Sequence, residues 1–470
     1  MHPTTDMRPN PWATFATCCL SIFLVSLDVT AMNVALPSVS RDLHTSIDGL
    51  QWTMDAYTVV IASFLMLAGA TADRFGRRRV FRIGLALFTT GSLLCSLSPS
   101  VEALIGFRVV QAFGGAMLNP VAMSIVVNTF PDVKVRARAI GMWGAVLGIS
   151  MALGPILGGI LVQTVGWRAI FWINIPIGIS ALLLTRIYVP ESRAERPRRV
   201  DPVGQGLVVV GLACLTATLI EGPHAGWASP PILGGIAISV AAIIGLIVYE
   251  RRISEPLIDI RFFRSIPFAS ATILAVLSFA TFNGALFLSS LYLQQARGLR
   301  PSHAGACMLP IAVTLVICSP LSGRMVGNGY TRRALLIAGT TIGIGGAVLA
   351  TCSLTTPLWL IMFGFAVFGI GLGSINPPIT NAAVSGMPRA QAGIAAGLAS
   401  TSRQVGASLG VAIAGSIATV DPHLPGFSAS THPFFWAVAG CGVAILALAI
   451  ISTSAYAKRS TEAIAELVAD

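Results

Sequence analysis

The sequence predicts an all-α integral membrane protein, on the strength of its composition, its long apolar runs and the placement of its basic residues. Of its 470 residues, 54% are hydrophobic and only 10% are charged, whereas an ordinary soluble chain carries about 25% charged residues. The apolar residues come in runs of about 20, the length that an α-helix needs to cross the hydrocarbon of a bilayer. These runs must be helices, because open strands leave backbone polar groups without partners in lipid.

Fourteen runs are candidate spans. They are 12–36, 50–72, 80–98, 102–127, 138–163, 168–189, 203–221, 231–249, 267–291, 301–323, 334–354, 357–381, 392–419 and 434–456. The first run is too long for a cleaved signal peptide and has no cleavage site, so we expect it to remain as the first helix. Six tryptophans lie near the expected span ends, as in an aromatic belt: Trp12, Trp52, Trp167, Trp227, Trp359 and Trp436.

Two charged, proline-containing segments, 190–202 and 250–265, flank one pair of spans and indicate six helices, an inserted pair and six more helices. The glycine spacing of 136–148 also returns weakly in 391–410, and repeated halves are typical of secondary transporters. The expected division is a cytoplasmic N-terminus (1–11), a first six-helix bundle (12–189), the inserted pair with its flanking loops (190–266), a second six-helix bundle (267–456) and a cytoplasmic tail (457–470).

The basic residues set the expected orientation. Of the 30 Lys and Arg residues, Arg108 and Arg403 lie within spans and four lie in one set of loops, which leaves 24 on the other side. Those four are Arg41, Arg168, Arg297 and Arg300. By the positive-inside rule, both termini face the cytoplasm of a multi-pass protein in the inner (plasma) membrane. The net charge of +11 therefore indicates topology, and without a basic face or aromatic platform it does not indicate nucleic-acid binding.

Few charges lie deep in the spans. Of 19 carboxylates, only Asp28 and Asp55 are well inside, and all six histidines lie in the N-terminus, outer loops or outer helix ends. If protons drive this protein, a carboxylate must carry them. Charged groups inside a membrane default to functional hypotheses because they are costly to bury.

Asp28 lies ~12 Å and Arg108 ~9 Å from the outer ends of their spans, at 1.5 Å per residue. The matching depths predict an ion pair, with either a proton-coupling or a purely structural role. Asp55, ~8 Å deep, either joins the proton coupling or snorkels to the outer interface. Arg403 has no acid within a span of its own half, so it either supports the structure or contacts cargo.

Other chemistries lack their residues. The eight cysteines fall in apolar spans without CxxC spacing, and neither Lys134 nor Lys458 follows a glycine-rich phosphate loop. No nucleophile–base or metal-ligand set is present in the sequence. We therefore expect no enzyme activity, cofactor, metal or ATP.

The segment GATADRFGRRR (69–79) follows the second span. Its first glycine permits close helix approach, its second a tight turn, and its aspartate can meet a helix N-terminus or an arginine. The spaced pattern resembles the helix 2–3 signature of the major facilitator superfamily, with departures at Thr71 and Arg78. The resemblance implies an inner-gate latch of Gly69, Asp73, Arg74, Gly76 and Arg77. Segment 323–333 is similar to a degenerate second copy without the acid.

The segment GAVLGISMALGPILGG (144–159) has five glycines and one proline, which permit tight packing and a bend. Its end resembles the antiporter motif of exporters in this superfamily, which implies a role for Gly148, Gly154, Pro155, Gly158 and Gly159. LDVTAMNVALP (27–37) resembles the helix 1 signature of the fourteen-helix drug–proton antiporters (EmrB/QacA type). Segments 52–58, 104–120, 167–178, 221–227 and 291–305 resemble that family too.

The resemblance implies a major facilitator fold and a proton-coupled antiporter that exports small amphipathic drugs, antibiotics or metabolites. Its partners would be that cargo, protons and membrane lipids. Candidate cargo contacts are the polar side chains Asn33, Gln111, Asn174 and Arg403 within the spans. A nutrient symporter of the same fold and a non-transporting membrane sensor are the alternatives.

Overall fold

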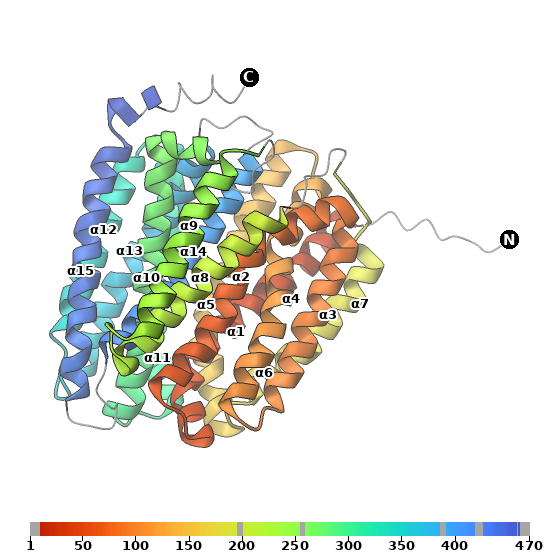
Figure 1. Ribbon diagram of the computed structural model, residues 1–470. Coiled ribbons are helices and arrows are strands. Elements are labelled where there is room, and N and C mark those ends of the chain that lie inside the picture. The colour runs from red at the N-terminus through yellow and green to blue at the C-terminus, as the bar shows by residue number, and fades with distance from the viewer. Residues whose placement is uncertain are drawn as a thin grey trace.

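The computed structural model describes residues 10–194, 201–253, 259–385, 392–418, 426–457 and 459–460. Most of the two expected tails, 1–11 and 457–470, and parts of the loops flanking the inserted pair lie outside these ranges. Within the described residues all regular secondary structure is helical, as the sequence predicts. Figure 1 shows the early helices on the right, the late helices on the left, and α8 and α9 in front of the region between them.

The helices follow one another along the chain with short connections. The first part comprises α1 (Pro11–Leu43), α2 (Ile47–Phe75), α3 (Arg77–Ser96), α4 (Val101–Thr129), α5 (Val133–Thr164), α6 (Ala169–Trp172) and α7 (Asn174–Tyr188). The pair α8 (Pro202–Ala225) and α9 (Pro230–Glu250) comes next. The last part comprises the 3-10 turn η1 (Ile260–Arg264), α10 (Ile266–Leu291), the π-helix η2 (Tyr292–Ala296), α11 (Pro301–Gly327), α12 (Thr331–Ala350), α13 (Leu358–Val384), α14 (Ala392–Ile417) and α15 (Phe427–Ser452).

Twelve stretches of helix in the described chain are long and apolar enough to cross a membrane, and α6 with α7 forms one of them, Ala169–Tyr188. This agrees with twelve of the fourteen expected spans. The expected spans 80–98 and 392–419 correspond to α3 and α14, which are not among the twelve. The helix α3 begins with basic residues, and α14 is a continuous helix that contains a polar stretch from Ser400 to Gln404. Both features lower the mean hydropathy of these helices.

Two helices extend past prolines that the expected spans did not cross. The first span was expected to end at 36, but α1 continues through Pro37 to Leu43. The last was expected to begin at 434, but α15 begins at Phe427 and contains Pro433. A proline inside a helix removes one backbone hydrogen bond, and in α1 packing against neighbouring helices holds the added turns in place.

The helices α1–α7 form the first half of the protein and α10–α15 the second half. The helix α5 lies between α1 of its own half and α11 of the second half. Gly154 and Gly158 face α1, and a Cβ at Gly158 would lie 3.0 Å from the Cα of Ala31. Gly159 faces α11, where a Cβ would lie 2.9 Å from the Cα of Ser302. The glycines singled out in the sequence therefore let α5 approach two helices closely.

The helix α14 has the corresponding arrangement, between α10 of its own half and α2 of the other half. Gly406 and Gly410 face α10, where a Cβ at Gly410 would lie 2.6 Å from the Cα of Ala280. Gly415 packs against Gln51 of α2. The two helices thus occupy corresponding places in their halves, although in the segment 136–148 only Gly148 makes such a contact.

The pair α8–α9 attaches to the rest of the protein through α8, which packs against α2 and α14. Gln205 of α8 donates to the backbone oxygen of Ser63 in α2 at 2.6 Å, and the hydroxyls of Thr216 and Ser408 lie 3.2 Å apart. The helix α9 is largely exposed, with apolar side chains such as Leu233 and Ile244 more than half accessible. Such a face suits contact with lipid.

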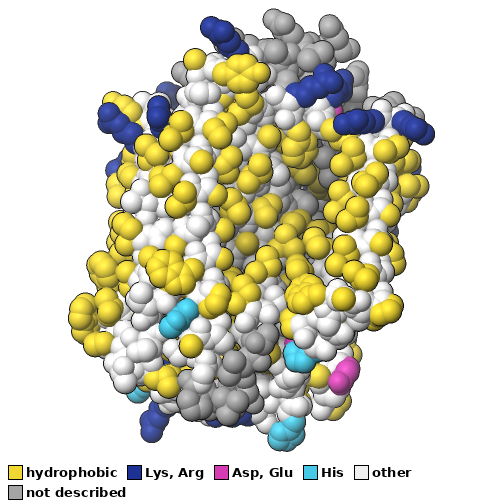
Figure 2. Space-filling model, turned by 60° about the vertical axis from the view of Figure 1, so that its left-hand side comes forward, with side chains coloured by type: hydrophobic (Ala, Val, Ile, Leu, Met, Phe, Trp, Pro, Cys, Tyr) yellow, Lys and Arg dark blue, Asp and Glu magenta, His cyan; other side chains and the backbone are white. Residues whose placement is uncertain are grey.

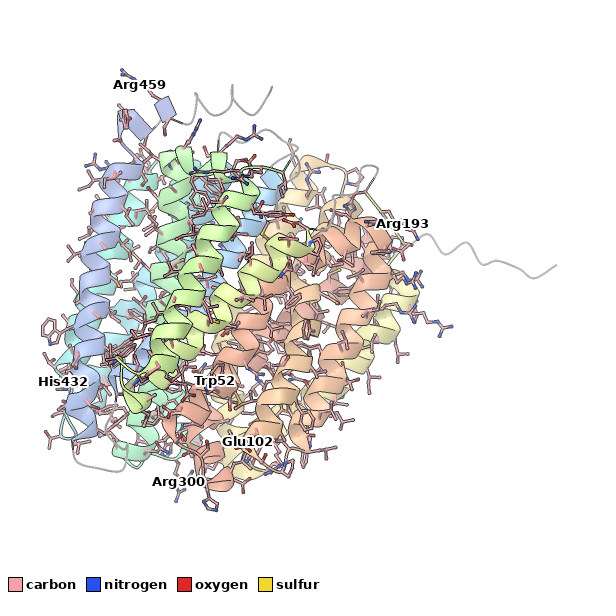
Figure 3. The ribbon with its side chains drawn as sticks, viewed as in Figure 1. Trp52, Glu102, Arg193, Arg300, His432 and Arg459 are labelled. Atoms are coloured by element: carbon pink, nitrogen blue, oxygen red, sulfur yellow. The ribbon has the colours of Figure 1, made fainter. Side chains whose placement is uncertain are left out.

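The two ends of the helix array differ in charge. Figure 2 shows a broad apolar surface between an upper end with several Lys and Arg side chains and a lower end with histidines, an acidic residue and fewer Lys and Arg side chains. Figure 3 places Arg193 and Arg459 at the upper end, and Glu102, Arg300 and His432 at the lower end. The labelled residues that were expected on the inner side thus lie at one end of the helix array, and those expected on the outer side lie at the other end.

The close contact of α5 with α1 leads to a stability prediction. Gly158→Ala places a methyl group against Ala31 and should destabilise the protein by about 1–3 kcal/mol through overpacking. Gly144→Ala is the matched control in the same helix, because a Cβ there meets nothing within 4 Å. Thermal unfolding in detergent should show a lower midpoint for Gly158→Ala only, and equal midpoints would contradict the packing described.

Candidate functional site

Asp28 and Arg108 form a fully buried ion pair inside the first half, as their matching depths predict. Arg108 Nη1 lies 2.5 Å from Asp28 Oδ2, and both side chains have no exposed surface. Gln111 Nε2 and Asn174 Nδ2 donate to Asp28 Oδ1 at 2.9 and 2.8 Å. The carboxylate of α1 therefore has three donors, two from α4 and one from α7.

Further groups hold Arg108 in place. Its Nη1 also donates to Gln111 Oε1 at 2.7 Å, and its guanidinium lies over the ring of Tyr57, 4.0 Å from the centroid. Ser92 Oγ of α3 accepts from Gln111 at 2.7 Å. Ser92 and Tyr57 were not among the candidate site residues, and the only signal for Tyr57 was its place in the family-like segment 52–58.

The approach of α3 to α4 makes this network possible. A Cβ at Gly91 would lie 2.5 Å from the Cα of Gln111, so only a glycine permits this contact. The close approach brings Ser92, the next residue, within hydrogen-bond distance of Gln111 and Asn174. The site therefore depends on a small residue in α3 as well as on its charged members.

The four candidate cargo contacts lie in different surroundings. Gln111 and Asn174 hydrogen-bond to Asp28, and the Nδ2 of Asn33 donates to the backbone oxygen of Val29 in its own helix. In α14, Arg403 is half-buried and donates to Ser400 Oγ at 2.8 Å. Within the described residues Arg403 makes no ion pair, which leaves its charge available to an anionic group.

Asp55 lies between the two halves and does not snorkel to the surface, contrary to one of the two expectations. Its side chain is fully buried, on the part of α2 that packs against α8 and α14. Oδ1 accepts from the hydroxyl of Thr58 at 3.3 Å, and among the described residues no group donates a hydrogen bond to the buried Oδ2. The snorkelling expectation failed because α8 and α14 cover the helix face that carries Asp55.

The segment 69–79 forms the junction of α2 and α3. Asp73 makes an ion pair with Arg77 at 2.8 Å, which is one of the two partners expected for it. Gly76 has φ +109°, the positive value that the expected tight turn requires. Arg74 is exposed, with its guanidinium over the ring of Phe75, and Gly69 approaches Pro120 of α4.

The chain that follows α7 docks on this junction. The backbone N–H of Arg77 donates to Ser192 at 2.9 Å, and that of Ala194 donates to the backbone oxygen of Asp73 at 3.1 Å. Glu191 accepts from the backbone N–H of Arg78 at 3.1 Å. These contacts join the α2–α3 junction to the loop that leads from α7 to α8, and none of them involves the second half.

The two halves meet firmly toward the lower end. One continuous hydrophobic cluster runs through the second half and also includes residues of α1 and α2, such as Met32 and Leu50, together with Leu291 and Met308 of α10 and α11. A separate cluster fills the first half alone and includes Phe81 and Val126. Among the described residues, hydrogen bonds between the halves, such as those that Gln51 and Gln294 donate, lie toward the same lower end. The structure is therefore closed at that end.

These features define a multi-pass helical membrane protein with two packed halves and charged side chains buried at membrane depth. The profile described as Major Facilitator Superfamily matches residues 18–411, so the chain belongs to this superfamily. It is accordingly a transporter and not an enzyme.

Three relatives are similar over most of the chain. The "Multidrug resistance protein Stp" of Mycobacterium tuberculosis (strain CDC 1551 / Oshkosh) is 38% identical over 86% of this chain and 76% of its own length. The "Tetracenomycin C resistance and export protein" of Streptomyces glaucescens is 37% identical, covering 88% and 77%. The "Methylenomycin A resistance protein" of Streptomyces coelicolor is 34% identical, covering 88% and 87%.

Two solved structures share the fold. The human organic anion transporter MFSD10 (TETRAN) superposes with a TM-score of 0.65 at 15% identity, over 94% of this chain and all of that one. The peptide-transporter family member PepTSo superposes with a TM-score of 0.69 at 16% identity, over 96% of this chain and 98% of that one. At these identities the likeness concerns the fold alone.

The buried ion pair leads to a second prediction. Arg108→Gln leaves a buried aspartate without its cation, and Asp28→Asn leaves a buried arginine without its anion, each at a cost of about 3–5 kcal/mol. The double variant removes both charges, so it should cost little more than either single change. Thermal unfolding and transport rates of the three variants measure this coupling. Strictly additive losses would show that the two side chains do not act as a pair.

Proposed function

We propose that this chain is a proton-coupled antiporter that exports small amphipathic drugs, antibiotics or metabolites across the plasma membrane. The observation that carries the proposal is the buried network of Asp28, Arg108, Gln111 and Asn174. A charged group at membrane depth is expensive and is typically retained for function. Among the described residues, this network holds the one carboxylate that is ion-paired deep inside a bundle.

The network can couple protons to movement because its charge balance changes with one proton. With Asp28 ionised, the pair with Arg108 is neutral and its hydrogen bonds hold α1, α4 and α7 together. Once Asp28 takes up a proton, Arg108 is a buried cation without its counter-ion, which is unfavourable in a low dielectric. The bundle must then rearrange to give Arg108 water or another partner. Return of the proton resets the site.

Asp55 supplies a second carboxyl group on the pathway. It lies where α2, α8 and α14 meet, and the one described side-chain hydrogen bond to its carboxyl group comes from the hydroxyl of Thr58. A neutral acid fits such surroundings better than a carboxylate does. Separation of α2 from α14 would expose Asp55 to water, so this carboxyl group is suited to exchange its proton with the outer solution when the lower end opens.

The proposed direction of transport rests on the relatives and on the glycine motif of α5. Two relatives are named as resistance proteins and a third as a resistance and export protein. The motif residues Gly148, Gly154, Pro155, Gly158 and Gly159 place α5 against α1 and α11. We take cargo to enter from the cytoplasm or inner leaflet, and Arg403 of α14 to contact an anionic group on it.

The proposed topology has fourteen spans, with α3 and α14 added to the twelve, and the domain division expected from the sequence. The end with Arg193 and Arg459 faces the cytoplasm, together with both termini, because basic loops remain inside. The lower end then faces outward, and the structure has its outer side closed. The superfamily-like residues Gly69, Asp73, Arg74, Gly76 and Arg77 lie on the inner side, where the proposed latch acts.

Proton coupling leads to a third prediction. Asp28→Asn keeps nearly the same shape but cannot carry a proton, so it should lose uphill transport while downhill exchange persists. The assay is movement of ethidium in proteoliposomes under an imposed pH gradient, with equal amounts of protein. Asp42→Asn is the control, because Asp42 lies on the same helix in an exposed ion pair with Arg168.

Uphill transport by Asp28→Asn at the wild-type rate would remove Asp28 from the coupling and leave Asp55 as the candidate. Movement of substrate in the same direction as protons would favour the symporter alternative. Absence of any flux with a panel of amphipathic substrates would favour the non-transporting sensor.

Topology leads to a fourth prediction. Cysteine at exposed Ala228, in the α8–α9 loop, should react with a membrane-impermeant maleimide added to intact cells. Cysteine at exposed Arg193 should react only after the cells are opened. The eight native cysteines are free, and each is buried or half-buried, so they give a low background. Labelling of the Arg193 position in intact cells would refute the proposed orientation.

A further inference from the structure

Pro37 creates a free backbone acceptor in α1. A helix carbonyl normally accepts from the N–H four residues later, but for Asn33 that residue is Pro37, which has no N–H. The helix continues past this proline to Leu43. The carbonyl of Asn33 therefore lies in the middle of a buried helix and needs a donor from elsewhere.

The donor comes from the other half of the protein. Ser290 Oγ of α10 donates to the backbone oxygen of Asn33 at 2.5 Å. Gln294 Nε2 donates to the backbone oxygen of Val34 at 2.8 Å and to Ser290 Oγ at 3.1 Å. Asn33, Val34 and Ser290 are essentially inaccessible, and Gln294 is only 8% exposed.

The local backbone supports this contact. Gln294 lies in the π-helix η2 (Tyr292–Ala296), which directly follows α10. Single π-helical turns often occur at functional sites. The two segments in contact, 27–37 and 291–305, were both singled out in the sequence, and the Asp28 network does not use Pro37 or Gln294.

A second contact joins the halves in the opposite sense. Gln51 Nε2 of α2 donates to the backbone oxygens of Val411 and Ala412 in α14, at 3.3 and 2.9 Å. Gly415 leaves room for its amide. Each half thus extends a glutamine side chain to backbone carbonyls of the other half.

We propose that Ser290, Gln294 and the backbone carbonyl of Asn33, which Pro37 leaves without a helical donor, form a neutral latch at the lower, outer end. This outer latch, which is distinct from the inner-gate latch of segment 69–79, holds the outer end closed and breaks in each transport cycle. Gln51 supports it from the opposite half. Neutral hydrogen bonds suit a gate, because each shifts the equilibrium between the closed and the open outer end by only roughly 2- to 12-fold. A few of them together favour the closed state without preventing opening. The proposal rests on alternating opening of a transporter and does not depend on proton coupling.

The test measures opening of the outer end directly. Spin labels are placed on cysteines at two exposed positions, Glu102 and Thr355. Figure 3 shows Glu102 at the lower end of the first half, and Thr355 lies in the α12–α13 loop, whose Cys352 contacts His432 at the lower end of the second half. The half-buried Cys214, Cys318 and Cys441 are replaced by alanine in this background. Distances between the labels in lipid nanodiscs give the ratio of open to closed molecules.

Ser290→Ala combined with Gln294→Leu should raise the open-to-closed ratio by roughly tenfold, which corresponds to about 1.4 kcal/mol. Ser278→Ala is the matched control, because this buried serine of α10 donates only within its own helix. An unchanged ratio in the double variant, or an equal change in Ser278→Ala, would overturn the latch.

Pro37→Ala tests the latch from the α1 side, even if the α10 variant folds poorly. It restores an N–H to the carbonyl of Asn33, so the ratio should rise with Ser290 intact. In the Ser290→Ala background the same change should cause no further opening. Independent, additive effects would contradict the proposal. In Asp28→Asn, by contrast, loss of pH-driven transport with an unchanged ratio would concern the proton coupling alone, because this variant leaves Pro37, Ser290 and Gln294 intact.

Discussion

The buried pair of Asp28 and Arg108 is the constraint on which the first half of the protein depends. Two charges without access to water require each other and further hydrogen-bond partners. The partners of the charges are Gln111 on α4 and Asn174 on α7, and Ser92 on α3 accepts from both of these amides. The network explains why polar residues lie in spans that otherwise suit hydrocarbon.

The connection between the halves is of a different kind. Small residues on α5 and α14 bring backbones together, and neutral hydrogen bonds join helix carbonyls to side chains across the interface. Such contacts depend on close fit and not on charge, so the halves can separate without leaving a charge exposed to lipid. A first half joined through buried charges and a neutral interface between the halves together suit the proposed alternating access.

Much of this arrangement could be predicted from the sequence, because membrane burial makes each feature visible. The long apolar runs predicted the helices, and the matching depths of Asp28 and Arg108 predicted their ion pair. The glycine spacing indicated that α5 and α14 are corresponding helices. The sequence did not show that α1 passes through Pro37 or that α8 and α14 bury Asp55. Those outcomes depend on contacts between residues far apart in the chain, as does the placement of Tyr57 over Arg108.

The proposed proton coupling requires that Asp28 gains and loses a proton while the protein changes conformation. Infrared difference spectra between acidic and neutral pH test it directly, through the C=O stretching band of a protonated carboxylic acid. Wild-type protein in lipid should show this band. In Asp28→Asn the part of the band that comes from Asp28 should be lost, and the part that comes from Asp55 should remain. An identical band in wild type and Asp28→Asn would show that Asp28 does not take up the proton.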